Sequence, residues 1–346
     1  MSKFNTILIT GVRGMDGSTL AEKYLDMGVK VIGVDIWEPT SSYPNLVKCF
    51  KNPNFIFETG DITEYEWIEY LMRTHEPDAV YNLGAISLVP ESFKLPKKYL
   101  EVNTFPIIHF LELIRYRYPK TRFYQASSSE QIGKITDPNQ DTDSKMIPAS
   151  PYGIAKLAAF HYVRLYRDSY GIYAVNGMLW NHEGPRRGPK FVTRKITIHV
   201  GKYANGDKTP LHMGNLNSGR DWGLSSDYCD AMILMMEADT PEDYAVATGE
   251  THSVREFITE AYGAIGVQVV WEGEGVDEKG FHKDTGELLV DVNPHLYRPL
   301  EVPFLHGNPI KIKKNLGWDP KTKFKELVKI MVDNDVELEK TSKLLE

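Results

Sequence analysis

Short apolar runs rich in β-branched residues alternate with amphipathic stretches of helical period along the first half of the chain. The runs expected to form strands are 6–10, 29–35, 54–59, 79–83, 122–126 and 173–179. This alternation is typical of right-handed βαβ units, which build a parallel sheet with helices on both faces. The pattern therefore predicts an α/β fold with a doubly wound parallel sheet.

The regular alternation stops after Asn181, and proline and glycine punctuate residues 181–224. Helical periodicity returns near 227–239 and 253–265, and an extended segment begins at Val267. We therefore interpret residues 1–180 as the main part of a larger domain. Residues 181–346 are interpreted as mainly a smaller, mixed α/β C-terminal lobe, with segments that return to the first domain.

Composition excludes several classes of protein. Of the 346 residues, 42% are hydrophobic and 25% charged, which is typical of a globular protein with a sizeable core. The net charge of -7 gives no overall attraction for nucleic acid or for an anionic membrane. Cys49 and Cys229 cannot form a disulfide framework, and no Cys/His spacing indicates a metal site. With no membrane-spanning run and no leader pattern at the start, we expect a cytoplasmic protein.

Three glycines follow the first predicted strand, and the pattern of a helix begins at Ser18. Glycine lets the backbone turn tightly and approach a pyrophosphate, whose charge the positive end of the next helix stabilises. Because strand, glycines and helix occur in the required order, the motif predicts a Rossmann-type dinucleotide site. The residues of this turn expected to contact the cofactor are Gly11, Arg13, Gly14, Met15, Asp16 and Gly17.

The ends of the next strands add further cofactor candidates. Asp35 ends the second strand, where a carboxylate can bind the adenosine ribose, which favours NAD over NADP. Arg13 could instead pair with a 2′-phosphate, so we predict NAD and keep NADP as the alternative. Asp61 is expected either to contact the adenine or to cap a helix. The other candidates at these strand ends are Ile62, Leu83 and Ala85.

Hydroxyl, carboxyl and amino groups gather around the end of the fifth predicted strand and the helix after it. Ser128 and Glu130 follow the strand end, where ligands of doubly wound folds bind. Tyr152 and Lys156 share one helix face, so the ammonium group can stabilise a phenolate and lower the pKa of Tyr152. Beside a nicotinamide, these groups predict hydride transfer, with Tyr152 taking the alcohol proton. Glu130 adds the base that removal of a carbon-bound proton requires.

These residues resemble those of the extended short-chain dehydrogenase/reductases and, within them, the GDP-mannose 4,6-dehydratase family. The similarity covers nearly the whole chain, and its most specific blocks are NHEGPRRGPKFVTRKI at 181–196 and GNLNSGRDWG at 214–223. The other matching blocks are TGVRGMDGSTLAE at 10–22, YNLGA at 81–85, FYQASSSE at 123–130, SPYGIAK at 150–156, ATGETHSVREF at 247–257 and YRPLEV at 297–302. The resemblance implies a dinucleotide-binding domain that carries the catalytic residues and a smaller lobe that binds a nucleotide sugar.

The resemblance implies oxidation of a GDP-activated, manno-configured sugar at C4, loss of water across C5 and C6, and hydride return to C6. Tyr152 is then the base at C4 and Lys156 its electrostatic partner. Ser128 polarises O4, and Glu130 is the acid and base at C5 and C6. The implied substrate contacts are Ser87, Glu130, Asn181, Val192, Lys195, Gly214, Arg220, Arg298 and Glu301.

The resemblance also bears on the cofactor and on assembly. His182 and Arg187 are implied cofactor contacts. Arg186 and Arg187 lie in a loop that the family uses for cofactor contacts across a subunit interface. A homotetramer is therefore implied, with a dimer as the alternative.

Several positions depart from the family pattern. Asp35 and the two residues after it replace an arginine pair, which again favours NAD, and Leu88 stands where a histidine is usual. Ser128, Ala149 and Gly184 have lost side-chain volume, so we expect more space around the sugar. A GDP-D-glycero-D-manno-heptose is therefore a candidate substrate beside GDP-mannose.

Two other functions stay open at this point. An epimerase or reductase of the same fold would need Tyr152 and Lys156 but not Glu130. A non-catalytic nucleotide-binding scaffold would keep the dinucleotide site alone. The presence of Ser128 and Glu130 together with the tyrosine and lysine argues against the scaffold.

Overall fold

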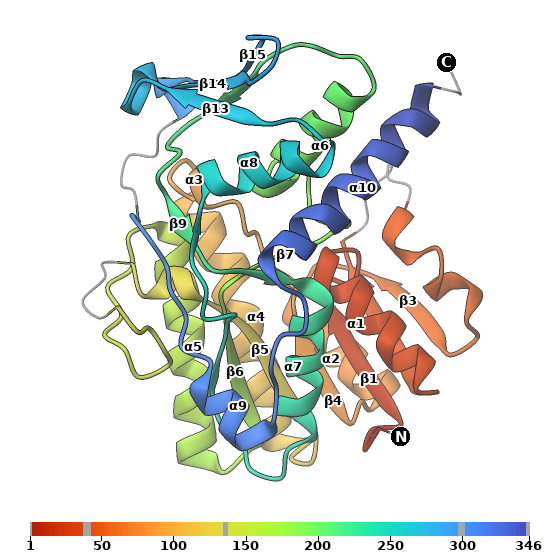
Figure 1. Ribbon diagram of the computed structural model, residues 1–346. Helices are drawn as coiled ribbons and strands as arrows, with labels where there is room; N and C mark the ends of the chain where they lie inside the picture. Colours follow the sequence, from red (N-terminus) through yellow and green to blue (C-terminus); the bar gives the residue numbers. More distant parts are fainter. Residues whose placement is uncertain (1, 37–42, 134–137, 297–301, 344–346) are drawn as a thin grey trace.

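A seven-stranded parallel sheet forms the centre of the computed structural model, which describes residues 2–36, 43–133, 138–296 and 302–343 (Figure 1). Its strand order is β11-β6-β5-β4-β1-β2-β3, and all neighbouring strands run parallel. The strands are β1 (Thr6–Thr10), β2 (Lys30–Asp35), β3 (Phe55–Thr59), β4 (Ala79–Asn82), β5 (Arg122–Ser128), β6 (Ala174–Leu179) and β11 (Tyr244–Val246). The six strands expected from the sequence all form, and the doubly wound α/β prediction is confirmed.

Helices cover both faces of this sheet because successive residues of a strand point to opposite sides. In β1, Ile7 and Ile9 pack with the first helix layer, whereas Leu8 packs with the second, and all three are fully buried. The first layer holds α1 (Met15–Asp26), α7 (Ser225–Glu237) and α9 (Ile310–Leu316). The second holds α2 (Tyr65–His75), α4 (Pro96–Tyr116) and α5 (Pro151–Tyr170). The short α3 (Val89–Ser92) follows β4.

A smaller mixed sheet lies at the top of Figure 1, in the order β13-β14-β15-β8. Only β15 and β8 pair in parallel within it. Its strands are β8 (Leu211–Met213), β13 (Val269–Glu272), β14 (Lys279–His282) and β15 (Leu288–Val292). The helices that share its apolar core are α6 (Val192–Ala204), α8 (Val254–Ala264) and α10 (Phe324–Lys343). The mixed α/β character expected for this part of the chain is therefore present.

Two short strand pairs complete the described structure. They are β7 (Asn181–Glu183) with β10 (Trp222–Leu224), and β9 (Gly219–Arg220) with β12 (His252–Ser253). We propose the division into residues 1–180 and 181–346, with α7, β11 and α9 as the segments that return to the main sheet. None of the helices within the described ranges has the length and apolar character needed to cross a bilayer.

One boundary next to the glycine motif differs from the expectation. Helix α1 begins at Met15, and not at Ser18, because Gly14 adopts an extended conformation (φ −64°, ψ 171°) and ends the turn there. Gly17 consequently lies inside the first turn of the helix. The turn between β1 and α1 is therefore shorter than the glycine spacing suggested.

Candidate active site

A cavity of about 1290 Å³ opens at the carboxyl ends of the main-sheet strands and extends to the smaller lobe. The candidates that line it from the larger domain are Gly11, Arg13, Gly14, Met15, Asp16, Gly17, Asp35, Asp61, Ile62, Leu83, Ala85, Ser87, Ser128, Glu130, Tyr152 and Lys156. Those from the second half of the chain are Asn181, His182, Arg187, Val192, Lys195, Gly214 and Arg220. Arg298 and Glu301 lie outside the described residues, so their roles stay predictions. The fold thus gathers every other candidate around one space.

The glycine turn at the bottom of the cavity leaves a helix end open to a ligand. Gly11 has a φ of +68°, and a Cβ there would lie 2.8 Å from the Cα of Gly84, so no larger residue fits. A Cβ at Gly17 would lie 2.4 Å from the carbonyl O of Gly11. The N-cap residue Gly14 has no side chain that could cap α1, and Met15 and Asp16 line the cavity. The first turn of α1 therefore fits the pyrophosphate of a dinucleotide.

Asp35 and Arg13 lie together at one end of this cavity. The Asp35 carboxylate accepts a hydrogen bond from the Arg13 main-chain N–H at 3.0 Å and another from the Ile36 N–H at 2.9 Å. The Arg13 guanidinium donates to the Ile36 carbonyl at 3.1 Å and lies over the Tyr43 ring. Asp35 thus also holds the glycine turn in place, besides being available to a ribose.

Asp61 does not cap helix α2, so the capping alternative is wrong. The N-cap of α2 is Glu64, and the Asp61 carboxylate instead accepts hydrogen bonds from the N–H and hydroxyl groups of Thr63 at 2.9 and 2.8 Å. This local turn keeps Asp61 on the cavity wall. An adenine contact is therefore the remaining interpretation for this residue.

Tyr152, Lys156 and Ser128, which the sequence predicts to lie beside the nicotinamide, are all buried. Burial raises the pKa of Tyr152 to about 12; a hydrogen bond with Ser128 opposes this rise, and the charge of Glu130 adds to it. Burial also lowers the pKa of Lys156 to about 8. Lys156 Nζ donates to the Ala126 carbonyl at 2.9 Å and lies 5.9 Å from the centre of the Tyr152 ring. Burial thus dominates the pKa of Tyr152, and the lowering expected from the Lys156 ammonium group stays a prediction.

Glu130 follows β5 in a single turn of 3₁₀ helix, Ser129–Gln131. The Ser128 hydroxyl accepts a hydrogen bond from the Glu130 main-chain N–H at 3.3 Å. The buried Gln131 side chain closes the turn by accepting from the Ser128 main-chain N–H at 2.9 Å. The main chain of Glu130 is thereby fixed beside Ser128, and Glu130, Ser128 and Tyr152 all line the cavity.

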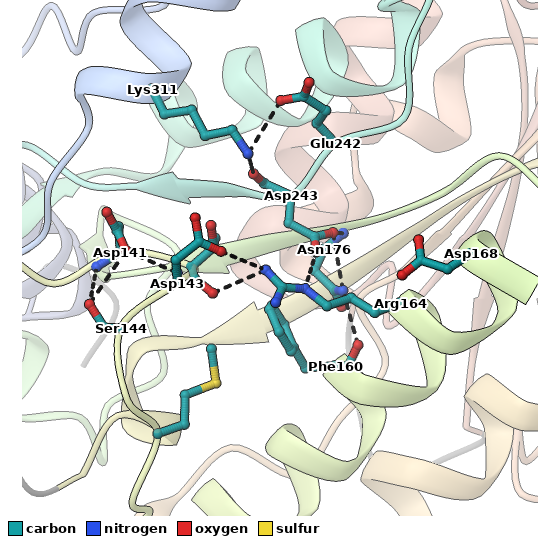
Figure 2. Close-up of polar contacts among 12 residues, drawn as sticks. Asp141, Asp143, Ser144, Phe160, Arg164, Asp168, Asn176, Glu242, Asp243 and Lys311 are labelled. Atoms are coloured by element: carbon teal, nitrogen blue, oxygen red, sulfur yellow. Dashed lines mark hydrogen bonds and ion pairs between the residues drawn. The ribbon is translucent and has the colours of Figure 1, made fainter.

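The helix that carries Tyr152 and Lys156 is anchored at both ends. At its start the Ser150 hydroxyl accepts a hydrogen bond from the Gly153 N–H at 3.0 Å. Near its other end the carboxylate of Asp243, just before β11, accepts from Arg164 Nε at 2.7 Å and from Arg167 Nη1 at 2.8 Å. Figure 2 shows Arg164 directed at this carboxylate, with the loop residue Asp143 on its other side. These contacts fix α5 against the sheet.

Two cations, Lys195 and Arg220, and the amide of Asn181 line the cavity from the smaller lobe. Lys195 Nζ donates to the His212 carbonyl at 2.6 Å, and burial lowers the pKa of Lys195. Arg220 is 6% exposed, and its guanidinium donates to the carbonyls of Gly219 and Val302 at 2.8 and 3.0 Å. Both side chains are therefore held in fixed positions, as recognition of a diphosphate requires.

The arginine loop after β7 is bonded within its own chain. Arg186 donates to Ser18 at 3.1 Å and to Glu22 at 2.6 Å, both on α1. Arg187 lies 3.0 Å from the buried Glu183 carboxylate, and only Arg187 of the pair lines the cavity. The cofactor role expected for Arg187 is thus compatible with contacts inside one subunit.

The idea that three small residues widen the sugar site is wrong for two of them. Ser128 lines the cavity, whereas Ala149 does not line it and packs against an apolar cluster that includes Trp180. A Cβ at Gly184 would find its nearest neighbours at 3.8 Å, yet this residue does not line the cavity. Leu88, where a histidine was expected, does line it.

Some lining residues had not been expected from the sequence. Lys94, Lys98 and Phe93 follow β4 and α3, and Lys190 belongs to the arginine loop. Their only sequence signal was their position shortly after a strand end or a matched motif. No group of metal-ligating side chains occurs among residues that the structure describes.

The comparisons with known proteins agree with this geometry. A family model described as GDP-mannose 4,6 dehydratase matches residues 8–331. The chain is 43% identical over 340 residues to GDP-mannose 4,6 dehydratase 2 of Caenorhabditis elegans, covering 96% of this chain and 89% of the relative. It is 41% identical over 346 residues to the human GDP-mannose 4,6 dehydratase, covering 98% and 93%. The crystal structure of UDP-glucose 4-epimerase from Thermus thermophilus, in complex with NAD, matches with a TM-score of 0.79 at 26% identity, covering 95% of this chain and 98% of that one.

Proposed function

This chain belongs to the GDP-mannose 4,6-dehydratase family, and on that premise we propose that it is a hydro-lyase acting on a GDP-activated, manno-configured sugar. The product would be the GDP-4-keto-6-deoxy sugar. One observation carries the proposal: Glu130 lines the same cavity as Ser128, Tyr152 and Lys156, and it is close enough to Tyr152 for its charge to act on that phenol. A dehydrogenase needs only the last three groups, whereas elimination of water needs the additional carboxyl group.

The first turn of α1 and the strand ends around it would hold the dinucleotide. Their open helix end fits a pyrophosphate, and Asp35 fits a ribose. NAD is the proposed cofactor and NADP the alternative, because Arg13 lies beside Asp35. A bound nicotinamide supplies the acceptor for hydride from C4 and its donor to C6, so the reaction has no net redox change.

Tyr152 and Ser128 would act on the sugar hydroxyl at C4. The Tyr152 oxygen takes the O4 proton as the C4–H bond breaks, while Ser128 holds O4 by a hydrogen bond. The raised pKa of Tyr152 makes the phenolate a strong base once it forms. Lys156 keeps the required positive charge close to this pair.

Glu130 would then move one proton across the C5–C6 bond. Oxidation at C4 acidifies the C5 proton, which the Glu130 carboxylate removes. The same carboxylic acid protonates the departing hydroxyl group at C6, and water leaves. As hydride returns to C6, the proton that Tyr152 took from O4 would be delivered to C5, so both residues regain their starting protonation states and the sugar loses one water and nothing else.

The test is to incubate the purified protein with GDP-mannose and, in parallel, with GDP-D-glycero-D-manno-heptose, and to measure loss of one water by mass spectrometry. We expect dehydration of GDP-mannose. Preferential turnover of the heptose would assign the larger sugar, a possibility that Ser128 on the cavity wall supports. Glu130→Gln should lower turnover by about 10²- to 10⁴-fold. Unchanged turnover in that variant would favour an epimerase or reductase, and no reaction in the wild type would favour the scaffold.

The cofactor can be identified independently of turnover. Denaturing the purified protein and analysing the released nucleotide by mass spectrometry should give NAD. Release of NADP would show that Arg13, and not Asp35, determines which dinucleotide binds at this end of the cavity. A protein that neither releases nor binds a dinucleotide would contradict the proposed site.

We propose a second copy of this chain as a partner, seated on the exposed faces of α4 and α5. Ile154, Tyr162 and Leu165 recur at helical spacing on α5 and are 54%, 37% and 54% exposed. Leu100 and Phe105 on the adjacent α4 are 39% and 45% exposed. A symmetric dimer through this face would bury both apolar stripes, and the tetramer implied by the family resemblance would pair two such dimers.

Sedimentation velocity tests this assembly. The wild type should sediment as a dimer or tetramer, and Leu165→Asp should shift it toward smaller species. Leu338→Asp, at a 55% exposed position on α10, is the matched control and should leave the assembly unchanged. A monomeric wild type at micromolar concentration would contradict the proposal.

A further inference from the structure

A chain of buried polar side chains crosses three central strands beneath the cavity. The Gly84 N–H donates to Thr10 Oγ1 at 2.9 Å, and the Thr10 hydroxyl donates to Asn82 Oδ1 at 2.8 Å. Asn82 Nδ2 donates to Gln125 Oε1 at 2.8 Å, and Gln125 Nε2 donates to the Ala126 carbonyl at 2.9 Å. Thr10, Asn82 and Gln125 are at most 1% exposed. The three links from Thr10 to Ala126 are therefore shielded from water, and the first link, at Gly84, is part-buried at the cavity.

The direction of this chain is fixed by its two ends. A main-chain N–H group at Gly84 can only donate, and a carbonyl at Ala126 can only accept. Each hydroxyl or amide between them must accept from one side and donate to the other. The two amide groups of Asn82 and Gln125 consequently have one orientation each, and neighbouring hydrogen bonds of the same direction strengthen one another.

The chain ends on the same atom that holds Lys156. The Ala126 carbonyl accepts from Gln125 Nε2 and from Lys156 Nζ, both at 2.9 Å. Lys156 is 4% exposed. The position of its ammonium group therefore depends on a carbonyl whose second lone pair is taken by Gln125.

We propose that Gln125 is a positioning residue for Lys156, acting through the Ala126 carbonyl and itself oriented by Asn82 and Thr10. The motifs around all three match the family, yet the sequence assigns no role to these side chains. The inference rests on the proposed function only in naming Lys156 as catalytic. The geometry that carries it is independent of the sugar.

Gln125 also affects the charge of Lys156. A carbonyl that already accepts one hydrogen bond is a weaker partner for a second donor, so Gln125 limits how well the ammonium form is stabilised. Burial already lowers the pKa of Lys156 to about 8. Loss of the Gln125 donor would leave the carbonyl to Lys156 alone and raise this pKa. The titratable and charged groups around the neighbouring phenol are Glu130, Arg187 and Tyr99, which the substitution leaves in place.

Gln125→Met is the direct test, because it keeps the side-chain volume and removes both hydrogen bonds. Gln140→Met is the matched control: Gln140 is fully buried, accepts a hydrogen bond from the His306 N–H at 3.2 Å and does not line the cavity. Competitive acetylation of lysines across a pH series, read by peptide mass spectrometry, follows the titration of Lys156 without any sugar. We expect Gln125→Met to shift this titration upward by about 0.5 to 1 pH unit. Gln140→Met should not shift it.

Turnover gives a second readout. In Gln125→Met, kcat should fall by about 10-fold with little change in KM, and the limb of the pH profile that depends on Lys156 should move with the labelling result. A Lys156 titration equal to that of the wild type would overturn the inference, whatever happens to stability. If Gln125→Met does not fold, Gln125→Asn breaks the same contact because its amide is one methylene shorter. Absence of dehydratase activity in the wild type would contradict the proposed function alone, since the labelling experiment still reports on Lys156.

Discussion

Asp16 and His182 form a buried ion pair that joins the first turn of α1 to β7. The distance from Asp16 Oδ2 to His182 Nε2 is 2.6 Å, and Nδ1 of the same ring lies 2.8 Å from the Trp180 carbonyl. If Nε2 donates to the carboxylate and Nδ1 to the carbonyl, both ring nitrogens carry a hydrogen, so this arrangement favours the imidazolium form of His182. Burial opposes each charge, but the attraction between the partners raises the pKa of His182 and lowers that of Asp16.

Asp16→Asn should therefore destabilise the protein. Loss of one partner from a buried pair leaves an uncompensated charge, so we expect the free energy of unfolding to fall by about 3–5 kcal/mol. Ser225→Ala is the matched control, because it removes the 2.6 Å hydrogen bond to the other Asp16 oxygen but leaves the ion pair in place, and it should cost about 1 kcal/mol. Urea unfolding of both variants measures the difference.

The pH dependence of that difference has a definite sign. The raised pKa of His182 stabilises the folded state fully below the ordinary histidine value, and this contribution is lost as the pH rises through the folded value. The lowered pKa of Asp16 stabilises above the ordinary aspartate value, and this contribution is lost as the pH falls. The effect of Asp16→Asn should thus be largest between about pH 4 and pH 6.5. A difference that grows with alkaline pH would contradict the ion pair.

Asp243→Asn should also lower the free energy of unfolding strongly. The Asp243 side chain is 2% exposed and bonds Arg164 (Figure 2) and also Arg167. Burial opposes its charge, but these arginines and the Asn176 N–H hold the pKa of Asp243 below its usual range. Asp243→Asn should lower the free energy of unfolding by about 3–5 kcal/mol at neutral pH.

Asp143→Asn is the matched control for Asp243→Asn, because Arg164 contacts both carboxylates. Asp143 lies 3.4 Å from this arginine, but its side chain is 76% exposed, so Asp143→Asn should cost only about 0–1 kcal/mol. In the wild type the Asp243 contribution is present above the ordinary aspartate pKa and is lost as the pH falls through the lowered value. Acid unfolding followed by circular dichroism should show that Asp243→Asn lacks this loss. Equal effects of the two substitutions would contradict the anchoring role.

The sequence predicted the parts of this fold that depend on local pattern. The apolar run at 6–10 predicted a strand in a sheet covered by helices on both faces, and the structure places Ile7, Leu8 and Ile9 in two different helix layers. The start of α1 was placed three residues late, because only the extended backbone of Gly14 reveals where the turn ends. The local pattern thus predicts which helices and strands form, but not the residues at which they begin and end.

Contacts between distant segments were beyond such reasoning. Asp16 and His182 are 166 residues apart, and the sequence assigns each to the cofactor without any sign that they bond to one another. The spacing of Tyr152 and Lys156 correctly put both on one helix face, but the partner of the lysine is a carbonyl of β5. The pKa of Tyr152 is set by burial, which a sequence does not display.

Gly17→Ala should disrupt the dinucleotide site. A Cβ at this position would meet the Gly11 carbonyl O at 2.4 Å and the Val12 Cα at 2.7 Å, both main-chain atoms that cannot move aside. The forced shift should cost about 1–3 kcal/mol of stability and about 10-fold or more in dinucleotide affinity. Binding of NAD and NADP, followed by tryptophan fluorescence, checks the affinity.

Gly263→Ala is the matched control for that substitution. Gly263 also lies in a helix, but a Cβ there would meet nothing within 4 Å. Alanine should therefore stabilise the protein by about 0.5–1 kcal/mol and leave dinucleotide binding unchanged. If Gly17→Ala bound the dinucleotide as tightly as Gly263→Ala, the close packing of the glycine turn could not be what shapes the site.

Lys156→Met should make the protein more stable and inactive at the same time. The buried ammonium group has a pKa lowered to about 8, so the folded state carries an unfavourable charge at neutral pH. Removing this charge should add about 3 kcal/mol to the free energy of unfolding at pH 7. Because the wild type can lose the proton in the folded state, the advantage of the variant should shrink between about pH 8 and pH 10.4. Lys329→Met, at a 63% exposed position, should change stability by less than about 0.5 kcal/mol. A Lys156→Met protein that is less stable than the wild type at pH 7 would contradict this prediction. It would show that contacts of the ammonium group offset the effect of its burial, so that its charge does not lower the free energy of unfolding.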